Sequence, residues 1–143
     1  MFKSILIATD GSELAEKAVD NGVALAKSLS AKVTGLTVAP MFPHYMFDTG
    51  FSKSAEFDVQ AQKQSQKALE SVERKATAAG VPCQTIAVGS DHVHEAIIEA
   101  AEARGCDLIV MASHGRAGMS AVVLGSQTQK VLTHSKIPVL VYR

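Results

Sequence analysis

The sequence predicts an α/β domain built on a five-stranded parallel sheet that helices cover on both faces. Apolar runs of strand length alternate with long amphipathic stretches of helical spacing. The strand runs lack the apolar–polar alternation of a half-exposed strand, which is typical of parallel strands buried on both faces. The chain has 143 residues, of which 47% are hydrophobic and 20% charged, so we expect one domain over residues 1–143.

The first half of the chain supplies two predicted strands and two helices. An apolar run at residues 4–8 closes on a turn signal, and a helix follows with apolar residues at helical spacing over 15–29. A second strand is predicted at 33–38. The next helix presents an apolar face over 61–79 and ends at Gly80, a residue favoured just beyond a helix C-terminus.

The second half continues the alternation of strands and helices. Three further apolar runs predict the remaining strands, at residues 85–88, 108–111 and 137–142. Asp91 is the candidate N-cap of the helix between the first two of these strands, which ends near Gly105. A short helix over 126–133 precedes the last strand.

Composition and charge exclude several classes of protein. Fourteen Lys and Arg balance fourteen Asp and Glu, whereas general nucleic-acid binders and polybasic membrane binders carry a basic excess. No apolar run is long enough to span a membrane, and Asp10 interrupts the N-terminal apolar run too early for a secretory signal. We therefore expect a cytoplasmic protein that binds neither nucleic acid nor a membrane.

One connection, from Pro40 to about residue 54, is longer than usual and gathers aromatic residues. It contains Phe42, Tyr45, Phe47 and Phe51, with Met41 and Met46 among them. Two interpretations stay open. The segment either folds onto the edge of the core or forms a lid or partner-facing patch with adaptable Met contacts.

A second irregular segment, residues 112–126, follows a predicted strand, contains three glycines and ends at a helix start. Glycine lets a ligand approach the backbone, and the N–H groups of a helix N-terminus bind anions. No Asp or Glu occurs from Ala112 to Arg143, while Arg116 and three further basic residues do. This pattern favours an anionic ligand over the alternative, a glycine-rich turn without one. It matches neither a Walker A loop nor the GxGxxG fingerprint.

Four stretches together resemble the universal stress protein family. They are Ile5–Ser12, Asp107–Gly115, Leu124–Ser126 and Ile137–Val141, and the resemblance extends over the whole chain. Nucleotide-binding members of that family carry the motif Gly-x2-Gly-x9-Gly-Ser/Thr. Gly115, Gly125 and Ser126 match it with the correct spacing, and Ala112 stands where the first glycine is expected.

The resemblance implies a strand order of 3-2-1-4-5 and an adenine nucleotide in the crevice where the first and fourth strands end. The nucleotide would be ATP, or ADP or AMP, with Mg²⁺ held mainly by its phosphates. The implied adenine and ribose contacts are Ala8, Thr9, Asp10 and the backbone of Val38, with Met111 and Ala112 as the floor. The implied phosphate contacts, through N–H groups and hydroxyls, are Gly115, Gly125, Ser126, Gln127 and Thr128. Asp10 has the alternative role of capping the first helix.

The substitution at Ala112 has two possible consequences. If the motif needs a positive φ there, alanine weakens binding, because its methyl group disfavours that conformation. If the motif needs only a close approach, the methyl group is tolerated. We expect binding to be retained.

Other chemistry is poorly supported by the sequence. His92 and His94 are two residues apart, so they do not share a helix face, and we expect no protein-held metal. His114 is either a phosphate contact or a surface side chain. Two strands lie between those begun by Cys83 and Cys106 in the implied order, so free thiols are expected.

These observations predict a stress-response protein that binds ATP and has no dedicated enzymatic activity, slow ATP hydrolysis being a third possibility. The alternative is a nucleotide-free interaction module of the same fold. The last strand, 137–142, is apolar and forms a sheet edge in the implied order. Because an apolar edge without charges invites pairing, we expect a homodimer through this strand.

Overall fold

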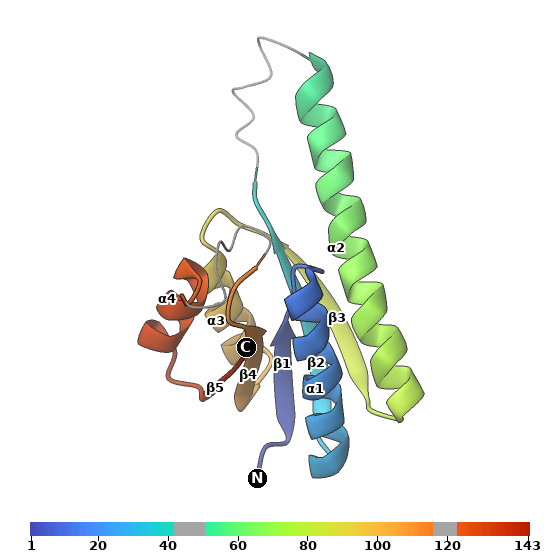
Figure 1. Ribbon diagram of the computed structural model, residues 1–143, viewed down its shortest axis with the longest axis vertical. Helices are drawn as coiled ribbons and strands as arrows, with labels where there is room; N and C mark the ends of the chain where they lie inside the picture. Colours follow the sequence, from blue (N-terminus) through green and yellow to red (C-terminus); the bar gives the residue numbers. More distant parts are fainter. Residues whose placement is uncertain (42–50, 116–122) are drawn as a thin grey trace.

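The computed structural model describes residues 1–41, 51–115 and 123–143, with the backbone alone described for 51–58. Within these described residues, five strands and four helices alternate; Figure 1 shows their arrangement. In chain order they are β1 (Ser4–Ala8), α1 (Glu13–Leu29), β2 (Lys32–Ala39), α2 (Phe51–Ala79), β3 (Cys83–Gly89), α3 (Val93–Ala103), β4 (Leu108–Ala112), α4 (Ser126–His134) and β5 (Val139–Tyr142).

The strands form one parallel sheet in the order β3-β2-β1-β4-β5, as expected. Alternate residues of each strand point to opposite faces, so the sheet has two apolar cores. On one face Ile5, Ile7 and Val110 pack with residues of α1 and α2. On the other face Leu6 and Ile109 pack with residues of α3 and α4. The predicted three-layer architecture is therefore confirmed.

Two predicted boundaries are wrong, at the start of α2 and at the start of β5. α2 begins at Phe51, so the predicted connection to residue 54 overlaps its first turn. β5 begins at Val139 rather than 137. Pro138 has no N–H to donate, although its carbonyl accepts a hydrogen bond from the Ile109 N–H at 2.9 Å.

The predicted cap of α3 is also wrong. His92 occupies the N-cap position of this helix, without a capping bond from its side chain. The Asp91 Oδ1 atom instead accepts a hydrogen bond from the Met41 N–H at 2.9 Å, which ties the end of β2 to the start of α3. The Asp91 carboxylate therefore bonds to the segment that follows β2 and not to the helix that it precedes.

The aromatic connection cannot be assigned to either of its interpretations, because residues 42–50 lie outside the described ones, as does Arg116. Both Cys83 and Cys106 are free thiols, with β2 and β1 between their strands. In the described part of the chain, no helix has the combination of length and apolar content needed to cross a bilayer.

Candidate functional site

The carboxyl ends of β1 and β4 lie side by side at the centre of the sheet, and their following connections diverge. β1 leads to α1 on one face, while β4 leads towards α4 on the other (Figure 1). In open parallel sheets, ligands bind at such a switch point, outside the carboxyl ends of the strands. The predicted site residues of both loops meet here.

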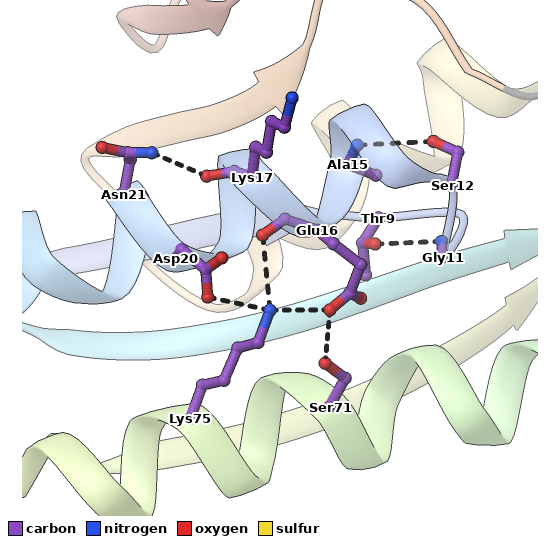
Figure 2. Close-up of polar contacts among 10 residues, drawn as sticks. All are labelled: Thr9, Gly11, Ser12, Ala15, Glu16, Lys17, Asp20, Asn21, Ser71 and Lys75. Atoms are coloured by element: carbon purple, nitrogen blue, oxygen red, sulfur yellow. Dashed lines mark hydrogen bonds and ion pairs between the residues drawn. The ribbon is translucent and has the colours of Figure 1, made fainter.

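The loop after β1 is held in place by its own side chains. The Gly11 N–H donates to Thr9 Oγ1 at 3.1 Å, and the Ser12 N–H donates to Asp10 Oδ1 at 2.9 Å. Ser12 is the N-cap of α1, since its hydroxyl accepts a hydrogen bond from the Ala15 N–H (Figure 2). Asp10 is therefore not the N-cap. It orders the turn, and its carboxylate lies against Gly115 of the loop that follows β4.

The start of α4 is anchored to the end of β4. The Thr128 hydroxyl donates to the Ala112 carbonyl at 3.0 Å, and the Gly125 N–H donates to the Ser113 carbonyl at 2.7 Å. Gly125 is the N-cap of α4 and supplies no side-chain capping bond. The N–H groups of the first helical turn have no acceptor within the helix, which makes this end of α4 suited to an anion.

The two motif glycines are closely approached by other parts of the site. A Cβ on Gly115 would overlap the Asp10 carboxylate, so the two loops are in direct contact. A Cβ on Gly125 would lie 3.2 Å from both the Ser113 carbonyl oxygen and the His114 Cα. Gly125 has a φ of −59°, so close approach, and not an unusual backbone conformation, requires glycine there.

Ala112 departs from the motif without backbone strain. It lies in β4, paired with Tyr142, and among the described residues other than glycine only Ser30 has a positive φ. Its methyl group packs against Ala15 and Ala18 of α1. The methyl group is therefore part of the core on the α1 face, and a glycine conformation is not needed at this position.

The residues expected around adenine share one part of the sheet. Met111 is buried in the core beneath α3 and α4, and the half-buried side chains of Ala8 and Val38 pack against the same cluster. They lie at the carboxyl ends of β4, β1 and β2. The structure thus brings these three apolar positions together.

Two predicted phosphate contacts have side chains engaged elsewhere. The Gln127 Oε1 atom accepts a hydrogen bond from the His94 N–H at 3.1 Å, at the start of α3. The Thr128 hydroxyl is buried on Ala112. These two residues therefore offer their backbone N–H groups to a ligand, whereas Ser126 is exposed and offers its hydroxyl as well. His114 contacts Ser113, with 3.2 Å between Nδ1 and Oγ.

A polar cluster that supports α1 was missed by the sequence analysis. Lys75 Nζ lies 2.7 Å from Glu16 Oε2 and 2.8 Å from Asp20 Oδ1, and the Ser71 hydroxyl donates to Glu16 at 2.6 Å (Figure 2). The i,i+4 spacing of polar residues beside the apolar faces of both helices was the available signal.

The electrostatics of this cluster favour a charged lysine. Burial acts to lower the pKa of Lys75, but the hydrogen bonds and charges of Asp20 and Glu16 outweigh it and hold the pKa above its ordinary value. The cluster joins the first half of α1 to α2. It thereby fixes the helix whose N-terminus forms one wall of the crevice.

Fold and site together define a parallel α/β protein whose predicted site residues gather at the switch point of its sheet. The universal stress protein family model matches residues 1–143, and the chain belongs to that family. It is 33% identical to universal stress protein YxiE of Bacillus subtilis, with all of both chains covered. The solved structure of MJ0577 from Methanocaldococcus jannaschii is 30% identical, with a TM-score of 0.80, covering 99% of this chain and 96% of that one.

Two more distant structures have the same fold. A universal stress protein solved in complex with cAMP is 23% identical, with a TM-score of 0.75, and covers 99% of this chain and 97% of its own. The universal stress protein of Archaeoglobus fulgidus in complex with dAMP is 17% identical, with a TM-score of 0.69, covering 99% of this chain and 98% of its own.

Proposed function

We propose that this universal stress protein binds an adenine nucleotide, ATP in the first place, in the crevice between the ends of β1 and β4. In this proposal it acts in the cytoplasm as a nucleotide-dependent regulatory dimer and not as a dedicated enzyme. The observation that carries the proposal is the packing at Gly125. A Cβ there would lie 3.2 Å from the Ser113 carbonyl oxygen and the His114 Cα, so a side chain would crowd the approach to the start of α4.

Each part of the nucleotide has a matching set of residues. The apolar ends of three strands, Ala8, Val38 and Met111, form a surface for the adenine ring. Asp10, at the mouth of the crevice, is placed to accept hydrogen bonds from ribose hydroxyls. Backbone N–H groups at the start of α4 would hold the phosphates, in a segment without acidic residues.

The residues present fit such a ligand. The substituted motif position, Ala112, directs its methyl group into the core on the α1 face, so it leaves the close approach at Gly115 and Gly125 unchanged. In this proposal the phosphates of the nucleotide hold Mg²⁺, as the resemblance to nucleotide-binding members of the family implies. The cAMP and dAMP complexes of more distant relatives support an adenine nucleotide in this fold.

The test is a calorimetric titration of the purified protein with ATP, ADP and AMP in the presence of Mg²⁺. Saturable binding with one nucleotide per chain is expected, and chromatography of the acid-released supernatant should detect copurified nucleotide. Failure to bind any of the three would favour the alternative, a nucleotide-free interaction module. Steady phosphate release from ATP, well above the buffer rate, would contradict the assignment of a binding role alone.

A further inference from the structure

β3 is an edge strand with an open outer side. It pairs with β2 alone. Two hydrogen bonds show which of its residues face β2: the Val33 N–H donates to the Pro82 carbonyl, and the Ser90 N–H donates to the Ala39 carbonyl. Because a parallel strand alternates its hydrogen-bonding direction, the odd-numbered residues 83–89 direct their N–H and C=O groups outward. In the described structure no strand pairs with that side. The strand contains no charged residue and no proline, the usual protections of an edge.

A groove of about 580 Å³ runs along this edge, between β3 and α2, which lie side by side in Figure 1. Its floor includes the small exposed residues Thr85, Ala87 and Gly89 on the α2 face of the strand. Its wall is one face of α2, with lining residues that recur at helical spacing from Ala61 to Glu73. If another strand paired with the outer side of β3, its side chains on the α2 face would lie in this groove, between the strand and the helix.

The two charged side chains that line the groove are acidic, and Arg74 lies beside them in the adjoining hollow. Glu70 and Glu73 are its charged lining residues, and both are exposed. Burial and the negative charge of Glu73 together raise the pKa of the Cys83 thiol, so the field of this carboxylate reaches the strand. The opposite face of β3 differs. There Ile86 and Val88 are half-buried in the second core, and Arg104 donates to Gln84 at 2.8 Å.

We propose that this edge binds an extended, basic segment of a partner protein, which adds to the sheet as a strand beside β3. Lys or Arg side chains on one face of the segment meet Glu70 and Glu73 beneath α2. Its alternate, apolar side chains lie next to Ile86 on the other face, where Arg104 disfavours a second row of cations. Hydrogen bonds to the outward backbone groups of β3 contribute affinity, and the charges of Glu70 and Glu73 make the edge selective for a basic segment.

A second copy of this chain is a poorer occupant of the same edge. Its own β3 has no basic residue to offer. Pairing of two such edges about a two-fold axis would also bring Glu70 and Glu73 of each copy towards those of the other, and like charges at close range are repelled. Charge therefore favours a basic partner.

Fluorescence anisotropy with a labelled synthetic peptide of alternating lysine and valine tests the proposal on the full chain. The wild type should bind this peptide, with affinity falling as salt increases. Glu70→Lys together with Glu73→Lys should weaken binding about tenfold or more. Glu102→Lys, an exposed charge reversal on α3, is the matched control and should leave binding unchanged. Ala87→Pro removes an outward N–H donor at a position where an edge strand tolerates proline, and should also weaken binding.

Four results would overturn the proposal. They are no measurable binding at millimolar peptide, equal binding of a peptide of alternating glutamate and valine, equal binding by the doubly reversed variant, and self-association of the wild type that Ala87→Pro abolishes. Circular dichroism melting establishes that each variant is folded. The ATP titration serves as an independent readout, because neither Glu70 nor Glu73 lies at the ends of β1 and β4, so loss of peptide binding is distinguishable from loss of the nucleotide site.

Discussion

The hydroxyl of Thr128 donates a hydrogen bond of 3.0 Å to the carbonyl oxygen of Ala112, and both residues are buried. This bond joins the first turn of α4 to the last residue of β4. It therefore fixes the helix N-terminus, to which we assign the phosphates, relative to the sheet.

Thr128→Val should lower the free energy of unfolding by about 1–3 kcal/mol, because it leaves the buried Ala112 carbonyl without its hydroxyl partner. Nucleotide affinity should fall as well. Thr133→Val is a matched control on the same helix, since the exposed Thr133 hydroxyl bonds only to the Gln129 carbonyl one turn back. Urea unfolding measures both variants, and equal effects would contradict the anchoring role.

Ala112→Gly should leave ATP affinity equal to or slightly higher than that of the wild type. The reason is that Ala112 has ordinary strand geometry and its methyl group packs against Ala15 and Ala18, away from the motif glycines. The same change should cost stability, by roughly 1 kcal/mol, through lost packing and greater freedom of the unfolded chain. A large loss of affinity in calorimetry would show that this departure from the motif has been misinterpreted.

Lys75→Met should destabilise the protein by about 2 kcal/mol near neutral pH, because Glu16 and Asp20 lose a charged hydrogen-bond donor. The exposed pair of Lys17 and Glu13, at 3.8 Å, provides the control. Lys17→Met should change stability by no more than about 0.5 kcal/mol.

The same cluster predicts a dependence of stability on pH. The native pKa of Lys75 is raised above 10.5, so its contribution is complete below that pH and is lost as the pH rises through the native value. The difference in unfolding free energy between wild type and Lys75→Met should therefore shrink in strongly alkaline buffer. A constant difference across that range would contradict the ion pair as its source.

Val141→Lys should shift the protein from dimer to monomer in sedimentation equilibrium. β5 is the other edge of the sheet; Val139 and Val141 are half-buried and Leu140 is exposed. Pairing with a second β5 would satisfy the free backbone groups, and a lysine at the junction would oppose it. Val59→Lys, on exposed α2 surface, is the control and should remain dimeric. A wild type that is monomeric at tens of micromolar would refute the interface.

How far the sequence predicts this molecule depends on the range of the interactions involved. Sequence patterns predicted every helix and strand that the structure describes, because strand and helix cores such as 4–8 and 15–29 are set by local burial patterns. Sequence patterns could not predict which side chains of distant elements bond to one another. Asp91 was predicted as a helix cap from its position, yet it binds the N–H of Met41, fifty residues away.

The candidate site was likewise predictable only where its features depend on local sequence. Motif spacing identified Gly115 and Gly125, and the structure supplies a steric reason for glycine at position 125, where backbone atoms would lie 3.2 Å from a Cβ. The spacing could not show that Gln127 and Thr128 direct their side chains to His94 and Ala112, because those bonds depend on how α4 packs against α3 and β4. It also could not show whether Ala112 is strained, which depends on the backbone conformation alone.

The most direct test of nucleotide binding at this crevice is a calorimetric titration of ATP with Mg²⁺ into wild type and Gly125→Val side by side. A valine at residue 125 would press on the Ser113 carbonyl and the His114 backbone, each already 3.2 Å from a Cβ, and so fill the approach to the start of α4. We predict one ATP bound per wild-type chain and none by Gly125→Val, with both proteins folded by circular dichroism. Equal ATP affinity in the two proteins would contradict the phosphate site.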